Sequence, residues 1–424
     1  AGVESSLADR DYNLLYTTNA TILSGDLNGD DNGNIIQTEA TRQDNAYHVV
    51  TAKGNYGTGG ELNGFIITGG NSNGGISNNC STSSTSQYDR RVGAAIYANP
   101  DGANYKVYLK VVNCKIEKNT GTYYAVLGRF SPCGDQGTQY HVDVTNCEIN
   151  DNYSASSANI GYTGNQQYNI RAYGKIVNSL ITNNSTGAAD KSSALIILSG
   201  GGSGSNTAAL VSVINTTISK TSSANNRAVT INLRSASSYP VYFFNTIVYD
   251  NGGTSSFNVL GTNGTSAAFS NNIVEGGQYS SDPSNPMFVD AVNSNFTLQP
   301  SSPAIDSGDN TRIPSGVTID LTGGVRINNS TVDIGAYEFG NILDVSDFTN
   351  EELSLSIYPN PTRNVLNIST VEKLEKVEVY NYIGQKVLES RQGPINVSNF
   401  NSGMYLLKVY TAKGGIAVKR FIKQ

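Results

Sequence analysis

The sequence predicts an all-β protein, in which a right-handed parallel β-helix (a solenoid) is followed by a small Ig-like β-sandwich. Three observations predict the solenoid. A short apolar segment with a central asparagine recurs, a second apolar strand recurs in step with it, and helical periodicity with caps is almost absent. The asparagines advance by about 26 to 37 residues, a repeat length typical of stacked coils. They are Asn113, Asn146, Asn178, Asn215, Asn245 and Asn271.

Each asparagine segment suits a strand that bends sharply as it passes from one flat sheet to the next. If coils stack at the parallel-strand spacing of about 4.8 Å, the asparagines form a buried ladder whose amides bond to each other. The second strand keeps the same drifting interval. Propellers and leucine-rich repeats need four strands per blade or a leucine-dense helical half, and neither pattern is present. The second strands begin at Ala94, Ala125, Ala158, Ala194, Ala228 and Phe257.

Composition supports a long solenoid and excludes several functions. Among 424 residues there are 44 glycines, 15% charged residues and no tryptophan, which suits many tight turns with amides and hydroxyls outside. A net charge of −6 argues against nucleic-acid binding, which needs clustered Lys and Arg. No run approaches the roughly 18 apolar residues of a membrane span, and no signal peptide stands at Ala1. We expect the chain to begin after processing or partway into a longer protein.

The four cysteines leave two interpretations open. Cys114 and Cys147 occupy the same position one coil apart, so their Cα atoms should lie about 5 Å apart, compatible with a disulfide. Cys80 and Cys133 lie in predicted loops and would form the other pair. Alternatively, stacked cysteines fill core volume as small apolar residues. No CxxC pair or histidine partner indicates a metal site.

The regular period predicts four regions. β-Helix coils are expected over residues 1–278. In residues 279–340, prolines and Asx turns replace the period, as expected of an irregular segment that covers the open end of a solenoid. Residues 341–350 read as a polar linker. In residues 351–424, Lys and Glu become frequent and short strands alternate with turns, which predicts the β-sandwich.

The irregular region resembles a known module. Its blocks are NPMFVD (285–290), SPAIDSGD (302–309), DLTGGVR (320–326) and VDIGAYEF (332–339). In content and order they are similar to the C-terminal module of the bacterial surface β-helix proteins called choice-of-anchor Q. The resemblance implies a protein displayed on the cell surface.

The C-terminal region resembles the type A sorting domain of type IX secretion substrates in Bacteroidota. The matching blocks are YPNPT (358–362), VYNYIGQKV (379–387), GMYLLKV (403–409) and the basic end KRFIKQ (419–424). The resemblance implies export across the outer membrane and recognition by the type IX translocon and its shuttle β-barrel, followed by surface attachment or release. An ordinary Ig-like accessory domain is the alternative. The implied secretion-signal residues are Tyr358, Pro359, Asn360, Pro361, Gly384, Gly403, Tyr405, Lys419 and Arg420.

No catalytic residue is predicted, although β-helices often carry polysaccharide lyases and glycoside hydrolases. A lyase needs a base beside carboxylates or calcium, and an inverting hydrolase needs carboxylates roughly 6.5–9.5 Å apart. Neither constellation stands out in the sequence. His141 alternates with Val142 and can point outward beside Asp143, but a hydrogen-bonded structural histidine is the better interpretation.

A weak calcium candidate lies near the N-terminus. Asp26, Asn28 and Asp30 place oxygen donors at alternate positions, without the glutamate that ends a calcium loop. Asx turns between coils explain the same residues and are favoured. No cofactor is required, and a structural calcium ion stays open.

Tyrosine is the abundant aromatic residue, with 25 copies. Several tyrosines stand just before the asparagine strands, where successive coils would place them on one lateral face. Such rings beside arginines suit surface glycans or lipopolysaccharide, and they equally suit packing at coil edges. We therefore predict an exported adhesin or glycan-binding surface protein, with a lyase or hydrolase acting in a lateral groove as the alternative. The candidate contact residues are Tyr105, Tyr140, Tyr168, Arg171, Arg234 and Tyr239.

Overall fold

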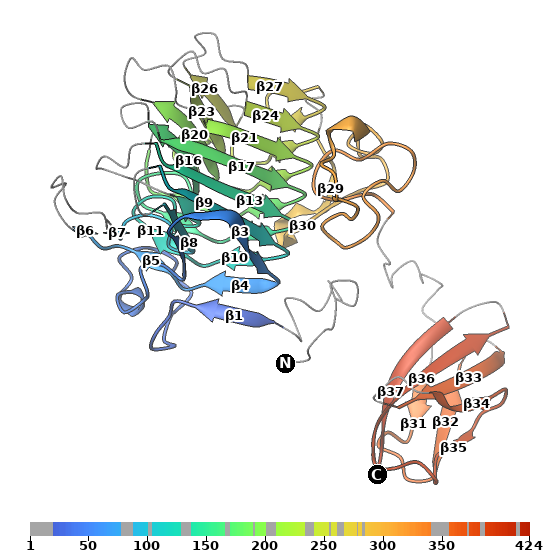
Figure 1. Cartoon of the computed structure of the whole chain (residues 1–424). Coiled ribbons are helices and arrows are strands. Elements are labelled where there is room, and N and C mark those ends of the chain that lie inside the picture. The colour runs from blue at the N-terminus through green and yellow to red at the C-terminus, as the bar shows by residue number, and fades with distance from the viewer. Residues whose placement is uncertain are drawn as a thin grey trace. The chain divides into compact units, whose positions relative to one another are not determined.

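The computed structural model forms two compact units, Ala1–Asn341 and Ile342–Gln424 (Figure 1). Its described residues hold strands and short 3-10 helices, and no helix among them is long and apolar enough to cross a membrane. The described residues are 20–77, 88–100, 104–128, 137–165, 170–189, 191–200, 209–233, 241–253, 256–260, 267–277, 279–281, 285–340, 356–370, 373–381, 386–412 and 416–424.

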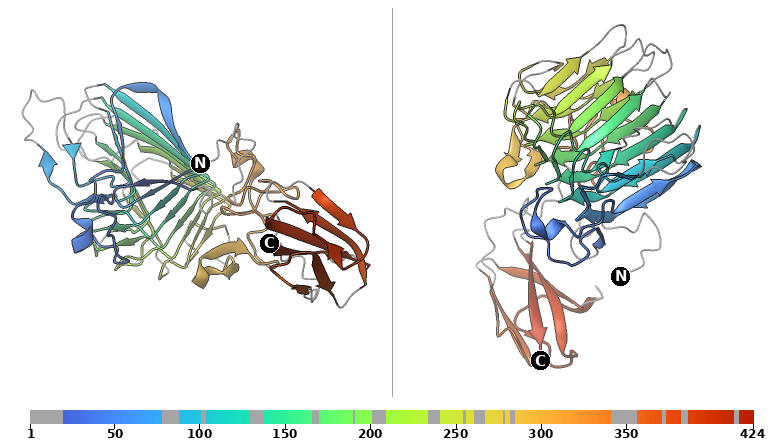
Figure 2. Two further views of the ribbon diagram at one scale, coloured as in Figure 1. Left: turned by 90° about the horizontal axis from the view of Figure 1, so that it is seen from below. Right: turned by 90° about the vertical axis from the view of Figure 1, so that its left-hand side faces the viewer.

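The first unit is a parallel β-helix, as predicted. Its strands stack in long parallel sheets, and each strand pairs with strands one coil away (Figure 2). The β8 sheet contains β2 (Val50–Lys53), β8 (Ile96–Asn99), β12 (Leu127–Gly128), β16 (Ile160–Asn165), β20 (Leu195–Gly200), β23 (Val229–Leu233) and β26 (Phe257–Leu260). The β9 sheet contains β3 (Tyr56–Asn63), β9 (Lys106–Val112), β13 (Gln139–Thr145), β17 (Arg171–Val177), β21 (Ala209–Ile214), β24 (Val241–Phe244) and β27 (Ala267–Ser270).

Shorter strands complete each coil. The β10 sheet contains β1 (Thr21–Ser24), β4 (Phe65–Thr68), β10 (Lys115–Glu117), β14 (Glu148–Asn150), β18 (Leu180–Thr182), β22 (Thr217–Ser219), β25 (Ile247–Tyr249) and β28 (Ile273–Val274). A fourth sheet contains β5 (Asn71–Ser72), β11 (Thr120–Gly121), β15 (Tyr153–Ser154) and β19 (Ser185–Thr186). A small hairpin pairs β6 (Ile76–Ser77) with β7 (Tyr88–Asp89).

The six recurring asparagines lie at the corner where the β9 sheet turns into the β10 sheet. All six have φ between 47° and 52°, in the left-handed region that asparagine tolerates better than most residues. Their recurrence therefore reflects the bend in the backbone. The expected amide ladder is present only in part. The Nδ2 groups of Asn113, Asn178 and Asn245 donate to the amide oxygens of Asn63 (3.0 Å), Asn146 (2.5 Å) and Asn215 (3.4 Å).

A second, fully buried ladder lies six residues further along each coil. Asn119 Nδ2 donates to Asn152 Oδ1 at 3.1 Å, and Asn152 Nδ2 donates to Asn184 Oδ1 at 2.9 Å. Each of these amides also donates to a backbone carbonyl, so the buried amides of this ladder are hydrogen-bonded. Sequence analysis missed this ladder. The repeated six-residue spacing from the corner asparagine was the available signal.

Cys114 and Cys147 are buried free thiols, so the disulfide considered between them is not formed. Each thiol instead contacts a carbonyl two residues earlier, Val112 O and Thr145 O, at 3.2 Å. At these positions the cysteines fill core volume beside the corner, which is the second of the two interpretations. Cys80 and Cys133 lie outside the described residues.

Alternation along the strands decides which side chains face out of the β9 sheet. In β13, Tyr140, Val142 and Val144 are buried inside the β-helix, while the residues between them face outward. Each fully buried aliphatic side chain stabilises the fold by about 1.5–3 kcal/mol. Burial of this apolar core fixes which residues of each strand face inward, and the residues between them must therefore face outward.

Residues 285–340, which we call the returning segment, pack along the side of the β-helix. The segment contains β29 (Phe288–Asp290), η3 (Ala291–Asn293), β30 (Asn295–Leu298) and η4 (Asn310–Arg312). The corner asparagines bind it, because Asn178, Asn215 and Asn245 donate to the carbonyls of Ile319 (2.9 Å), Asp333 (3.2 Å) and Asp309 (3.1 Å). These contacts span several successive coils.

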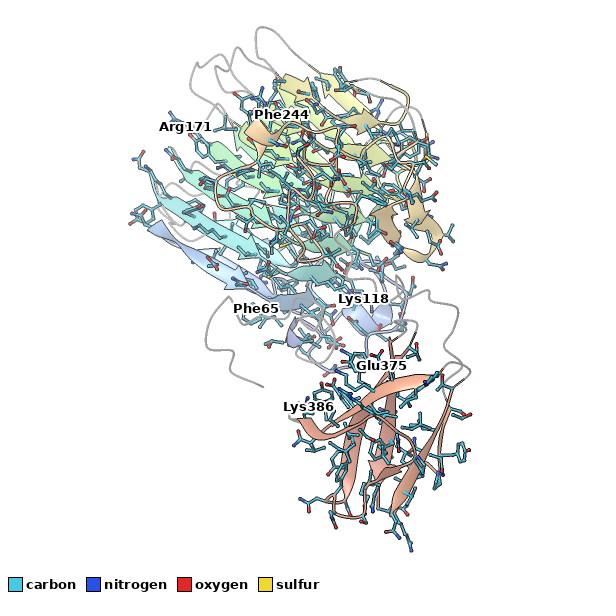
Figure 3. The ribbon with its side chains drawn as sticks, turned by 90° about the vertical axis from the view of Figure 1, so that its right-hand side faces the viewer. Phe65, Lys118, Arg171, Phe244, Glu375 and Lys386 are labelled. Atoms are coloured by element: carbon cyan, nitrogen blue, oxygen red, sulfur yellow. The ribbon has the colours of Figure 1, made fainter. Side chains whose placement is uncertain are left out.

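The expectation that this region covers the open end was therefore largely wrong. Near the end, Tyr279 stacks on Phe269 of the last coil, with ring centroids 4.4 Å apart. The returning segment instead runs along the corner of the β-helix. The corner asparagines supply amide groups there, and Ile214 and Phe244 form part of an outward apolar row. Figure 3 shows Phe244 where the returning segment crosses the sheet and Arg171 away from it.

A buried arginine holds the returning segment together. Arg326 donates to Asn178 Oδ1 (2.9 Å) and to the carbonyls of Asp333 (2.9 Å) and Gly335 (3.0 Å), and it pairs with Glu338 at 3.1 Å. Both partners of this ion pair have side chains 1% exposed. Burial raises the pKa of Glu338 to about 8, against the opposing effect of the arginine charge.

The second unit contains two small antiparallel sheets, in agreement with the predicted β-sandwich. One contains β31 (Ser356–Tyr358), β32 (Val365–Ser369) and β35 (Ile395–Asn396). The other contains β33 (Leu374–Tyr380), β34 (Lys386–Ser390), β36 (Gly403–Thr411) and β37 (Ile416–Lys423). Their core includes Leu366, Val377, Val379, Leu407 and Phe421. The predicted linker at 341–350 lies outside the described residues.

Candidate functional site

The outward faces of β9, β13 and β17 form a regular pattern of cations and rings. The strands β9 and β17 both pair in register with β13, which lies between them. Each of β9 and β17 presents a cation, a tyrosine and a lysine, and β13 presents glutamine, histidine and aspartate. We call these nine residues the tyrosine–lysine patch. They are Lys106, Tyr108 and Lys110 on β9, Gln139, His141 and Asp143 on β13, and Arg171, Tyr173 and Lys175 on β17.

An aromatic row runs across the middle of the patch. The ring centroids of Tyr108 and His141 are 4.5 Å apart, and those of His141 and Tyr173 are 6.0 Å apart. Glycine is required on the next strand, because a Cβ at Gly59 would lie 2.7 Å from the Tyr108 ring. The backbone at Gly59, with φ +82°, also favours glycine. The row is therefore built into the stacking of coils.

Asp143 organises the side chains around it. Its carboxylate accepts hydrogen bonds from His141 Nε2 at 2.8 Å, from the Tyr108 hydroxyl at 3.0 Å and from the backbone N–H of Lys175 at 2.9 Å. Although partial burial acts in the opposite direction, the bonds from His141 and Tyr108 and the nearby positive charge lower the pKa of Asp143. Burial and the Asp143 charge raise the pKa of Tyr108 to about 12. Tyr108 thus stays a protonated donor at neutral pH.

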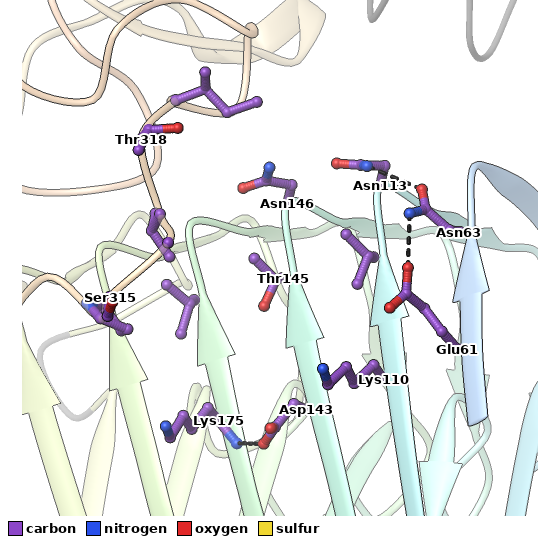
Figure 4. Close-up of a pocket in the computed structure, with 16 residues that line it drawn as sticks. Glu61, Asn63, Lys110, Asn113, Asp143, Thr145, Asn146, Lys175, Ser315 and Thr318 are labelled. Carbon is purple, nitrogen blue, oxygen red and sulfur yellow. Dashed lines mark hydrogen bonds between the residues drawn. The ribbon is translucent and has the colours of Figure 1, made fainter. Parts of the chain in front are cut away.

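A cleft of about 410 Å³ adjoins the patch (Figure 4). Its floor is the β9 sheet, where Lys110 and Lys175 project on either side of Asp143. Its wall is the loop 314–319 of the returning segment, which carries no charged side chain. The lining residues are Glu61, Asn63, Lys110, Val112, Asn113, Asp143, Thr145, Asn146, Lys175, Val177, Pro314, Ser315, Gly316, Val317, Thr318 and Ile319.

The predicted contact residues only partly coincide with this site. Tyr140 is fully buried and its ring is stacked with that of Tyr162, so the prediction that it lies on the outer face was wrong. Tyr140 and His141 are neighbours in β13, so their side chains point to opposite faces of the sheet, and that of Tyr140 points inside the β-helix. Tyr105 is 41% exposed just before β9, and Arg171 belongs to the patch. Tyr168, Arg234 and Tyr239 lie outside the described residues.

Sequence reasoning missed Tyr108, Tyr173 and the patch lysines. The available signal was the repeat of KVYLK at 106–110 as RAYGK at 171–175, two coils later. Period-two alternation places the charged and aromatic members of both segments on one face. His141 does point outward beside Asp143 and is hydrogen-bonded to it, as the sequence suggested.

The calcium candidate forms a tight turn. The carboxylates of Asp26, Asp30 and Asp44 lie within 4.8 Å of one another. Asp26 Oδ1 also accepts the backbone N–H of Gly29, three residues further on, at 2.7 Å, and Asn28 N–H donates to Asp44 at 3.0 Å, so these side chains hold the turn. These backbone bonds lower the pKa of Asp26 in spite of some desolvation. Such oxygens suit a hard cation, but part of the donor set is already used by the turn.

In the C-terminal unit, the YPNPT segment (358–362) contacts the basic C-terminal segment (419–424). Asn360 Nδ2 donates to Arg420 O at 3.0 Å, and Ile422 N–H donates to Asn360 Oδ1 at 2.9 Å. The first block is thereby attached to the last strand. Tyr358, Lys419 and Arg420 are exposed. Gly384 lies outside the described residues.

Comparison with known families identifies this unit. Residues 356–424 match the family described as a secretion system C-terminal sorting domain. No curated protein and no solved structure matches the chain. The protein is therefore exported across the outer membrane by the type IX system, to the cell surface or the extracellular space, and its C-terminal unit interacts with the translocon machinery.

Proposed function

We propose that this exported protein is a surface adhesin of the choice-of-anchor Q type, which binds a polysaccharide chain across the tyrosine–lysine patch. The observation that carries the proposal is the row of Tyr108, His141 and Tyr173, which lies beside the cleft. Shuttle-barrel recognition of the sorting domain would deliver it to the surface, where this face contacts glycans or lipopolysaccharide.

The chemistry of the row suits sugars. Half-buried tyrosine rings offer apolar faces to the C–H side of a pyranose, and hydroxyl, imidazole and amide groups beside them exchange hydrogen bonds with sugar hydroxyls. The cleft volume of about 410 Å³ lies within the range of ligand sites. The β9 sheet is rigid, so the rings are held in position before a ligand arrives.

An inverting hydrolase in the same cleft is the alternative, because Glu61 and Asp143 both line it, two strands apart. The protonation and hydrogen bonding of these side chains favour binding over hydrolysis. A Tyr108 pKa of about 12 makes this hydroxyl a poor general acid, and three hydrogen bonds already occupy Asp143.

The test is binding of the purified full chain to a polysaccharide panel by isothermal titration calorimetry. Tyr173→Ala should weaken binding about tenfold, as expected for loss of one ring contact. Tyr47→Ala is the matched control, because Tyr47 is 38% exposed and lies outside the patch. Binding that Tyr173→Ala leaves unchanged, or no binding to any polysaccharide, would overturn the proposal. Release of reducing ends would establish the hydrolase instead.

A further inference from the structure

We infer that the ligand of the tyrosine–lysine patch is an acidic polysaccharide, whose carboxylate or sulfate groups contact Lys110 and Lys175. The inference rests on the proposed function and specifies the class of glycan. It follows from the arrangement of charges on a protein whose net charge is −6.

Cations occupy the four corners of the patch. Lys106 and Arg171 align in one row, and Lys110 and Lys175 align in another, with the aromatic row between them. Each pair is separated by β13, so the two cations project from backbones about 9.6 Å apart at the usual strand spacing. That distance matches acid groups on separate sugar units better than a single small anion.

The positive charge is only partly neutralised by the protein. Within the described part of the chain, no ion pair is formed by Lys106, Lys110, Arg171 or Lys175. Asp143 is the carboxylate of the patch. The charge of Lys175 interacts with the Asp143 carboxylate, but the carboxylate oxygens are hydrogen-bonded to Tyr108, His141 and a backbone amide. Glu61, on the neighbouring strand β3, is bonded to Asn63 at 2.9 Å.

These contacts define how an acidic chain would lie. The negative charge of Asp143 repels an acid group at the centre of the patch, so a neutral part of the sugar sits over His141. The acid groups then fall over the lysines on either side, within reach of charge-assisted hydrogen bonds. The uncharged wall at 314–319 adds hydroxyls and backbone groups and no opposing charge.

The experiment compares matched polymers on the full chain by isothermal titration calorimetry. One pair is a polyuronate and its carboxyl-reduced neutral form, and the other is a sulfated glucan and its parent glucan. We expect at least one acidic polymer to bind about tenfold or more tightly than its neutral partner, with affinity falling as salt increases. The better acidic polymer identifies the acid group.

Equal affinity for acidic and neutral partners would overturn this inference while leaving the proposed glycan binding intact. Absence of binding to all four polymers would overturn the proposed function itself. The two failures are therefore distinguishable in one data set.

Variants test the named lysines. Lys110→Gln and Lys175→Gln should each weaken binding of the acidic polymer about five- to tenfold, and should leave binding of its neutral partner unchanged. Lys115→Gln is the control, because Lys115 lies on β10 and already pairs with Glu117 at 2.9 Å. Equal losses in all three variants, or none in the first two, would contradict the assignment. Since both patch lysines are exposed, the variants should fold normally, which circular dichroism can check.

Discussion

The two halves of the outer face of the β9 sheet share one architecture and differ in what covers them. Lys110, Asp143 and Lys175 are paired in register on β9, β13 and β17. The same row continues as Ser212 on β21 and Tyr242 on β24. The row beside it changes from Thr145 in the first half to Ile214 and Phe244 in the second. The first half is open and charged. The second half is apolar and lies under the returning segment.

The covered half shows what the open half lacks. Arg312 lies over the Phe244 ring at 4.4 Å, and Val317 packs against the cluster of Val177, Ile214 and Phe244. The returning segment thus buries apolar side chains that would otherwise face water. Where it ends, the same strand positions carry lysines, tyrosines and His141. In the covered half, the coils stack without lysine or histidine at these positions, which supports a binding role for the lysines and His141 of the open half.

Replacing Arg326 should have the largest effect on the covered half. Arg326→Met removes one member of a buried pair and leaves Glu338 and the acceptors on Asn178 and Asp333 without their partner, which typically costs about 3–5 kcal/mol. Hydrogen exchange of the returning segment should accelerate roughly 100- to 1,000-fold or more, while the open half exchanges as before. Arg312→Met is the matched control. It removes an exposed pair and a ring contact, and is expected to cost about 1 kcal/mol. Similar exchange in both variants would show that the segment is not held by Arg326.

A pair of corner asparagines compares the halves at the same backbone conformation. Asn113 and Asn245 both have φ 50°, so alanine costs the same strain at each. Asn245 exchanges two bonds with Asp309, donating to its carbonyl at 3.1 Å and accepting from its N–H at 2.8 Å. Asn113 donates to Asn63 at 3.0 Å. Asn245→Ala should destabilise about 1–3 kcal/mol more than Asn113→Ala in urea unfolding. A larger loss at Asn113 would contradict the proposed role of Asn245 in holding the returning segment.

The pH dependence of stability should also come from the covered half. The pKa of Glu338 is raised from 4.5 to about 8 in the folded protein, so between these values the folded state keeps a proton that the unfolded state releases. The free energy of unfolding should therefore fall as pH rises from about 4.5 to 8. Burial raises the pKa of Asp333 too, which acts in the same direction.

Urea unfolding at several pH values measures this effect. Glu338→Gln should flatten the decline, whereas Glu117→Gln, at a half-buried pair with Lys115, should not. A decline that persists unchanged in Glu338→Gln would assign it to other groups.

Calcium should have the smallest effect, because the turn at Asp26 lies outside both halves and is already satisfied by backbone N–H groups. Millimolar calcium is expected to stabilise the chain by about 1 kcal/mol or less, and Asp30→Asn should abolish this gain. Thermal unfolding with calcium or with a chelator measures it. A much larger shift would make the ion a structural requirement.

Much of the fold could be predicted from local signals. The recurrence of Asn113 and its equivalents predicted the coils, and the last 69 residues matched a sorting domain. The site was harder. Tyr140 and Tyr108 both lie on strands of the β9 sheet, where a register error of one residue exchanges inside for outside. The amide partners of the corner asparagines were also missed, because Asp309 and Asp333 are far from them in sequence.

The sequence by itself determined the stacked coils and the export address, because both are encoded in short segments whose periodicity and order need no distant partner. Only the tertiary structure decided that the returning segment runs along the corner, and that Tyr108 and Tyr173 face outward on either side of His141. The reason is physical. Which face a strand presents, and what covers it, depends on burial summed over many coils, and a single repeat does not contain that information.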